Sequence, residues 1–412
     1  FATSTHATNT DYITSGYWNA KLNDDAMYNA LGATNTRYND LDYERLWARV
    51  NDKTEHPDRP WVITEPNANG IDMYRYYANF DWFNYLFKKW RPRNEHNVSI
   101  NGSTDRVRYL LSGTAAKENG MWNVRPDIYN RANLRAKLDI DVTKNLTIGT
   151  NIRYFSSNYS WFGLEDNFPT VTNNVTPIHL YHFMPAYVPK NPDGTLTGYT
   201  GVNSYSVGYG MHAIMENGKS KGEDKLSEFV STLEASYKIA KNLKLTANYS
   251  YQQDTRDYYY RATRVQYSKF PGVLESYAVG GLNKDELKQS FQNNKYHIIN
   301  IFGNYGKTWG RHDFTAMAGF NQEERIFKTI GGTGKELLSE TLNDLSLTSG
   351  ENIVSGGASE WALRGVFYRF NYAFADRYLV EISGRYDGTS RFPKADRFGF
   401  FPSASVGWRI SE

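Results

Sequence analysis

The eight histidines have the broadest chemical range in this cysteine-free chain, because imidazole can bind a metal or move a proton near neutral pH. No pair of them forms a His-Glu-x-x-His motif, and the sequence has no Gly-x-Ser-x-Gly nucleophile elbow. His179 and His182 are close enough to share a metal ion, but they fit better as ordinary loop residues. Glu323 and Glu324 are adjacent on an expected strand and therefore point to opposite faces. The sequence predicts neither an enzyme nor a metal or cofactor site.

Aromatic side chains between residues 156 and 225 form the stronger chemical candidate. Flat aromatic faces beside Asn and Asp suit the recognition of sugar rings, and a peptide could use the same surface. An alternative is that these side chains pack the loop on itself or against a partner protein, and the sequence leaves it open. The predicted ligand-binding residues are Trp161, Phe162, Tyr181, His182, Tyr205 and Tyr209.

The elements that must position these residues are best seen near residues 366–387, where side chains alternate with a period of two. Such alternation places successive side chains on opposite faces of a strand. A tight turn at residues 375–377 separates two arms of about ten residues, close to the 9–11 that a membrane-spanning strand needs. The apolar positions of this hairpin are Val366, Tyr368, Phe370, Tyr372, Phe374, Tyr378, Val380 and Ile382.

The same alternation predicts about 11–12 strands, which are connected alternately by short turns and by long loops. Residues 1–96 are interpreted as the end of a first strand plus a long extracellular loop with short helices, capped by Asp40 and Asp81. Residues 97–412 are interpreted as membrane strands with long loops at 156–225, 253–295 and 328–361. A transmembrane antiparallel β-barrel has short periplasmic turns and longer extracellular loops, and it is the fold class we predict.

The composition agrees with this class. Aromatic residues make up 16% of the 412 residues, while the mean hydropathy is only −0.65. A membrane barrel combines these two properties, because only every second residue of a strand faces lipid and aromatic girdles mark both interfaces. The net charge of +3 gives no reason to expect a nucleic-acid partner.

One stretch near the end of the sequence resembles the signature of the SusC/RagA family of TonB-dependent outer-membrane transporters of Bacteroidota. In that family the pattern runs Asp-Arg-Tyr, then Arg-x-Asp-Gly-Ser-Ser-Arg-Phe, then Phe-Pro-Ser-x-Ser-x-Gly-Trp, and Thr389 is the one visible departure from it here. Residues 81–120 are also similar to the family's entry into its early barrel strands. The motif residues are Asp376, Arg377, Tyr378, Arg385, Asp387, Gly388, Arg391, Phe392, Pro402, Gly407 and Trp408.

The resemblance implies a barrel of about 22 strands that closes around a plug domain. We expect this chain to be a fragment that covers roughly the first half of that barrel, without the plug domain and the C-terminal barrel half. An open sheet with two unpaired edges is not viable in lipid, and this supports the expectation.

The resemblance also implies a location and a function, namely active import of a nutrient across the bacterial outer membrane. The expected partners are outer-membrane lipid, the TonB complex, which acts through the plug, and a SusD-like lipoprotein at the extracellular face. A dimer of transporter–lid pairs is a further expectation. The cargo is expected to be an oligosaccharide, since most relatives import glycans, and a peptide importer of the same family is the alternative.

Two other interpretations of the function, a passive porin and a soluble protein, stay open at this point. A passive porin would have the same strands without a plug. A soluble, β-rich glycan-binding protein would bury the apolar strand faces against other protein. The soluble fold gives no reason for long and short connections to alternate, and a plug domain would exclude the porin.

Overall fold

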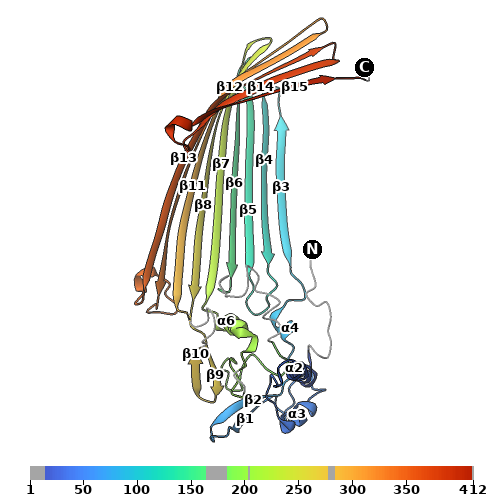
Figure 1. Cartoon of the computed structure of the whole chain (residues 1–412), viewed down its shortest axis with the longest axis vertical. Coiled ribbons are helices and arrows are strands. Elements are labelled where there is room, and N and C mark those ends of the chain that lie inside the picture. The colour runs from blue at the N-terminus through green and yellow to red at the C-terminus, as the bar shows by residue number, and fades with distance from the viewer. Residues whose placement is uncertain (1–13, 164–182, 203–204, 277–283, 411–412) are drawn as a thin grey trace.

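A computed structural model describes residues 14–163, 183–202, 205–276 and 284–410 of the chain. Eleven antiparallel strands form one sheet in the order β15-β14-β13-β12-β11-β8-β7-β6-β5-β4-β3, so each strand pairs with its neighbours along the chain (Figure 1). The strands are β3 (Arg93–Ser103), β4 (Val107–Asn119), β5 (Ile128–Asp141), β6 (Leu146–Trp161), β7 (Lys221–Ala240), β8 (Leu243–Ala262), β11 (Glu286–Trp309), β12 (His312–Lys335), β13 (Asn352–Phe374), β14 (Tyr378–Thr389) and β15 (Phe398–Trp408). The predicted antiparallel membrane sheet is confirmed.

Five short turns lie together at one end of the sheet, which we call the short-turn end. They connect β3 to β4, β5 to β6, β7 to β8, β11 to β12 and β13 to β14, where the sequence predicted turns. In the last of them, Ala375 and Asp376 both have φ of +54°. Two consecutive residues with positive φ are typical of the type I′ turn, whose twist matches that of the flanking strands.

One face of the sheet, the apolar face, carries large apolar side chains that no other part of the described chain covers. On strands far apart in the sheet, Leu134 of β5 is 57% exposed and Val406 of β15 is 84% exposed. A contiguous apolar surface of this extent needs a non-aqueous partner, and lipid supplies it for a membrane barrel. Exposed members of this face are Val98, Leu111, Leu134, Ile152, Leu233, Tyr249, Ile299, Phe370, Ile382 and Val406.

The strands run further than the apolar alternation predicted. The loops expected at 156–225, 253–295 and 328–361 are shortened to the connections 162–220, 263–285 and 336–351. Beyond the apolar face the side chains are polar, but the backbones continue to pair, and cross-strand contacts such as Arg256 with Asp224 at 2.6 Å hold them together. In these strands the alternation of apolar residues therefore ends before the strand itself ends.

Opposite the short turns is the long-connection end, where helices and two small hairpins gather (Figure 1). These elements are α2 (Gly16–Leu31), α3 (Asp40–Trp47), β1 (Val62–Pro66), β2 (Asp72–Tyr76), α4 (Trp82–Leu86), α6 (Met211–Asn217), β9 (Gln266–Phe270) and β10 (Val273–Ser276), with 3-10 helices at Val207–Gly210 and Leu345–Leu347. A further 3-10 helix, Lys394–Asp396, lies in the connection between β14 and β15, beside the middle of β13. Among the described residues, no helix is both long and apolar enough to cross a membrane.

The predicted helix starts are right in one case and wrong in the other. Asp81 is the N-cap of α4, and its carboxylate accepts a hydrogen bond from the Asn84 backbone N–H at 2.9 Å. The N-cap of α3 is Asn39 and not Asp40, because Asn39 and Asp42 form a reciprocal capping box. Helix α4 ends at Leu86, since Phe87 adopts an extended conformation and pairs with Trp122.

Candidate functional site

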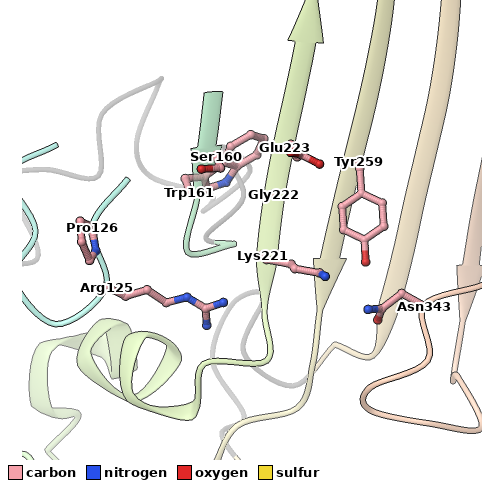
Figure 2. Close-up of a pocket in the computed structure, with 9 residues that line it drawn as sticks. All are labelled: Arg125, Pro126, Ser160, Trp161, Lys221, Gly222, Glu223, Tyr259 and Asn343. Carbon is pink, nitrogen blue, oxygen red and sulfur yellow. The ribbon is translucent and has the colours of Figure 1, made fainter. Parts of the chain in front are cut away.

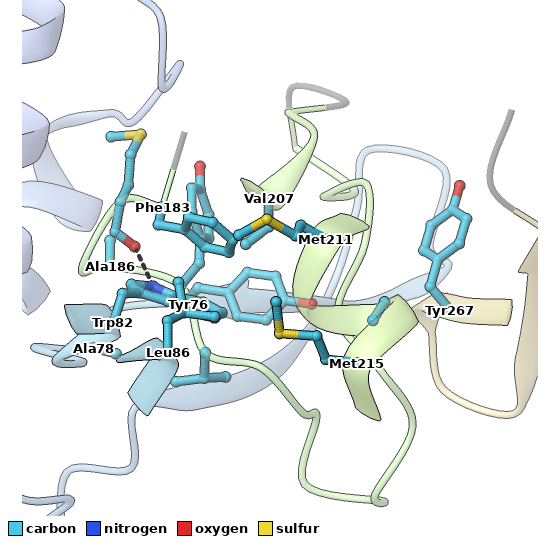
Figure 3. Packing of buried hydrophobic residues seen from close by; sticks show 14 of the residues in the cluster. Tyr76, Ala78, Trp82, Leu86, Phe183, Ala186, Val207, Met211, Met215 and Tyr267 are labelled. Atoms are coloured by element: carbon cyan, nitrogen blue, oxygen red, sulfur yellow. Dashed lines mark hydrogen bonds between the residues drawn. The ribbon is translucent and has the colours of Figure 1, made fainter. Parts of the chain in front are cut away.

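The long-connection end has a closed hydrophobic core, built from residues 14–92, 183–220 and 263–276 and here called the loop cluster. Trp82 lies near its centre, is only 1% exposed, and donates its indole N–H to the Met184 carbonyl at 3.1 Å (Figure 3). The rings of Phe183 and His212 pack against Trp82 at centroid distances of 4.6 and 5.2 Å. The loop cluster is therefore a folded unit with its own core.

Two of the predicted ligand-binding residues are part of this packing. Phe162 is 3% exposed and meets Trp122 edge-on at 5.7 Å. Tyr205 stacks on the buried Tyr187 at 5.2 Å. The packing alternative therefore holds for both side chains, and their contact with a ligand stays a prediction.

The remaining candidates are placed differently. Tyr181 and His182 lie outside the described residues, as does His179. Tyr209 belongs to the 3-10 helix Val207–Gly210. Trp161, at the end of β6, lines an open cavity of about 590 Å³.

This cavity, which we call the rim cavity, lies where β6, β7 and β8 reach the long-connection end (Figure 2). The connection between β4 and β5 forms one side of it, and the connection between β12 and β13 forms the other. Segments more than 200 residues apart in sequence thus converge on one site. Its lining residues are Arg125, Pro126, Ser160, Trp161, Lys221, Gly222, Glu223, Tyr259 and Asn343.

The sheet face opposite the apolar one, the polar face, carries ladders of hydrogen-bonded side chains. Asn321 donates to Asn300 at 2.7 Å, and Asn300 donates to Asn248 at 2.9 Å, across three neighbouring strands. Glu323 lies on this face and accepts a hydrogen bond from Tyr296, while Glu324 lies on the other face, as the alternation predicted. The arrangement suits a hydrated lining rather than acid–base catalysis.

The motif residues of the β14–β15 region fall into two groups. At the short-turn end, Tyr378 stacks on Trp408 at 6.5 Å, and the Arg377 guanidinium lies 5.8 Å from the Trp408 ring centre. Aromatic rings at this level of a membrane strand are typical of an interfacial girdle. Asp376 is in the turn beside them, and Gly407 pairs with Leu379 in the register of β14 and β15.

Of the other motif residues, Arg385 and Asp387 lie on the polar face, Pro402 lies on the apolar face, and Gly388, Arg391 and Phe392 lie at the far end of the hairpin. Arg385 donates to Asp387 at 2.9 Å, and the Arg391 guanidinium lies over the Trp361 ring at 4.8 Å. Gly388 lies against the ring of Phe398. Pro402 pairs with Gly384, and Phe392 is exposed. The motif thus fixes the packing of the last three strands and lies apart from the rim cavity.

No family model matches the sequence. Among curated proteins, the chain is similar to the TonB-dependent receptor SusC of Bacteroides thetaiotaomicron, with 28% identity over 365 residues that cover 81% of this chain and 33% of the relative. It is also similar to the TonB-dependent receptor P3 of Formosa agariphila, with 22% identity over 339 residues, 81% of this chain and 32% of the relative. The chain spans about a third of the length of these relatives.

Among solved structures, the fold matches the RagAB peptide transporter with a TM-score of 0.67 at 18% identity, covering 99% of this chain and 43% of that chain. The RagAB peptide importer in its open-open state gives the same TM-score at 19% identity, over 94% of this chain and 41% of that chain. The matches confirm the resemblance seen in the motif and set aside the soluble alternative. In sequence and fold the chain is SusC/RagA-like and is similar to TonB-dependent receptors of the bacterial outer membrane.

Proposed function

We propose that the protein actively imports a nutrient across the outer membrane with energy from the TonB complex. The observation that carries this proposal is the eleven-stranded sheet, which has one apolar face, one polar face and all its long connections at one end. A wall of this kind separates lipid from a hydrated lumen. The similarity to curated TonB-dependent receptors supports TonB as the source of energy for import.

We infer that the cargo is an oligosaccharide, captured together with a SusD-like surface lipoprotein. The similarity to SusC and the position of Trp161 beside an open cavity support this choice. Peptide import is the second candidate, because the fold match is to the RagAB peptide transporter. In either case the long-connection end receives the ligand, and TonB opens a passage by acting on the plug.

Uptake by cells that produce the intact protein tests the proposal. Labelled oligosaccharides and peptides are supplied to a strain with the gene, a strain without it and a strain with the gene but without TonB. We expect gene-dependent uptake of an oligosaccharide that disappears when TonB is removed. Uptake that persists without TonB would point to a passive pore, and uptake of peptides alone would select the second candidate.

Purification in mild detergent tests the partner. We expect a surface lipoprotein to remain bound through affinity and size-exclusion steps, in equal amounts with the transporter, and light scattering then measures whether two such pairs associate. Recovery of the transporter alone at physiological salt would contradict the lidded arrangement.

A further inference from the structure

The rim cavity contains two buried polar atoms whose hydrogen-bonding capacity is unused. Within the described residues, Nη1 of Arg125 and the hydroxyl of Tyr259 have no hydrogen-bond partner. Both residues line the cavity from opposite sides, as Figure 2 shows. A buried donor without an acceptor costs free energy, so a ligand that supplies the acceptors would bind favourably here.

The cavity also has unneutralised positive charge. Neither Arg125 nor Lys221 forms an ion pair with a described carboxylate, whereas Arg91 and Arg131 at the same end of the sheet pair with Glu118 and Glu95 at 2.5 and 3.0 Å. Burial lowers the pKa of Arg125, which is the signature of a cation that has lost water without gaining a counter-ion. Lys221 places its ammonium 5.4 Å from the centre of the Tyr259 ring.

The one carboxylate that lines the cavity is already engaged. Glu223 contacts the Lys225 ammonium at 2.9 Å and accepts a hydrogen bond from the Asn158 amide at 2.9 Å. Its charge is therefore balanced by Lys225, and the two cations of the cavity stay available for an anion from outside the chain.

The Trp161 ring lies at the same end of the strands, on the sheet face opposite Lys221 and Tyr259. The Trp161 indole stacks on Tyr159 at 5.4 Å and passes over Gly222. A Cβ atom at position 222 would lie 2.1 Å from the indole, so the absent side chain lets the ring lie along the strands. The hydroxyl of Ser160 and the amide of Asn343 add neutral polar groups to the lining around Lys221 and Tyr259.

We propose that the rim cavity binds an acidic saccharide, with its carboxylate or sulfate group between Arg125 and Lys221 and its hydroxyl groups toward Ser160, Tyr259 and Asn343. A bidentate guanidinium suits such an oxyanion, and the cavity volume of about 590 Å³ falls in the range of small-molecule sites. This inference deepens the proposed import function by naming a cargo class. An acidic saccharide of an outer-leaflet glycolipid would offer the same chemistry.

Calorimetry on the purified full-length protein in detergent tests the site with trigalacturonate, a neutral trigalactoside and a triglutamate peptide. We expect trigalacturonate to bind at least about 10-fold more tightly than the neutral trisaccharide and the peptide, with an affinity that falls as salt is added. Arg125→Gln and Lys221→Gln should each weaken it by about 10-fold or more. Lys117→Gln is the matched control, because it removes a charge from β4 at the same end of the sheet, outside the cavity.

Three results would overturn the inference: no binding of trigalacturonate, equal binding of the neutral trisaccharide, or full affinity in both cavity variants. Tight triglutamate binding with the same dependence on Arg125 and Lys221 would replace the saccharide by a peptide. Retention of the heat-dependent gel shift of a folded barrel shows that each variant has folded, and the exposed Lys221 provides a variant that leaves the core untouched.

Two further measurements separate the sources and the two proposals. Mass spectrometry of the purified protein reveals an acidic glycolipid if one occupies the cavity, whereas uptake of trigalacturonate by cells identifies it as cargo. TonB-dependent uptake of other nutrients without trigalacturonate binding would leave the import function intact and refute this site. Binding of trigalacturonate without any TonB-dependent uptake would support this site and refute the import function.

Discussion

Acidification should loosen the loop cluster through one buried histidine. His212 in α6 is fully buried, and its Nε2 lies 2.9 Å from the Thr197 carbonyl oxygen. A carbonyl only accepts hydrogen bonds, so Nε2 carries the proton of a neutral ring. Burial between Trp82 and Phe183 lowers the pKa of His212 from 6.5 to about 4.

The sign and size of the effect follow from this pKa. Above pH 6.5 the ring is neutral in both the folded and the unfolded state, and it makes no pH-dependent contribution. Between pH 6.5 and about 4 the unfolded state binds a proton that the folded state does not, so the free energy of unfolding falls as the pH falls. The full loss is about 3 kcal/mol, of which about 2 kcal/mol has occurred at pH 5.

Amide hydrogen exchange in the loop cluster, corrected for the intrinsic pH dependence of exchange, measures this loss. His212→Gln keeps a donor for the Thr197 carbonyl and cannot titrate, so we expect its stability to be nearly constant between pH 6.5 and 4.5. Glu216, the nearest charged group on the same helix, is held by Lys190 at 2.7 Å with a lowered pKa, and it therefore titrates below this window. Equal pH slopes in the wild type and in His212→Gln would refute the reasoning.

Three other substitutions probe separate parts of the fold. Trp82→Ala should destabilise the loop cluster by about 3–5 kcal/mol, as cavity-forming changes do, with wild-type membrane insertion as the control; unchanged resistance to proteolysis would contradict this. Asn39→Ala should cost about 1 kcal/mol and raise exchange in α3, whereas Asp40→Ala should have less effect, because Asp40 is not the cap. Gly388→Ala places a Cβ 2.3 Å from the Phe398 ring and should cost about 1–3 kcal/mol, measured as a lower unfolding midpoint of the barrel in detergent; an unchanged midpoint would show that the ring can move freely.

The strands and the short turns could be read from the sequence because each has a local signature. Every strand of the sheet has a stretch of apolar residues at every second position, and each short turn interrupts that period within a few residues. The parts of β8, β11 and β12 nearest the long-connection end have no such signature. Their pairing depends on cross-strand hydrogen bonds between residues distant in sequence, such as Asn294 with Asp254 at 2.7 Å.

The sequence predicted where the segments of the loop cluster lie, but it did not predict how they fold. Helix α2 was missed because its apolar residues follow no clear stripe, and Ser15 caps it with a single weak contact at 3.4 Å. The hairpin of β1 and β2 was missed because both strands have only five residues. Trp161 was predicted from the aromatic-rich segment, and its contact with a ligand stays a prediction. Arg125 has no signal in the sequence, since only the tertiary fold brings it to the same cavity as Lys221 and Asn343.

The sheet and the loop cluster are stabilised in different environments, and substitutions in them should therefore have different effects. Leu134 and Val406 of the sheet are exposed and gain free energy only when lipid or detergent covers them, whereas Trp82 and Tyr77 of the loop cluster are buried by the chain itself. A change in the loop cluster should therefore alter ligand capture without preventing insertion of the sheet. A substitution on the apolar face should mainly impair insertion of the sheet into the membrane. The rim cavity lies at the boundary, where the polar ends of β6, β7 and β8 extend beyond the apolar face, and so its cations can be exchanged with little effect on either hydrophobic surface.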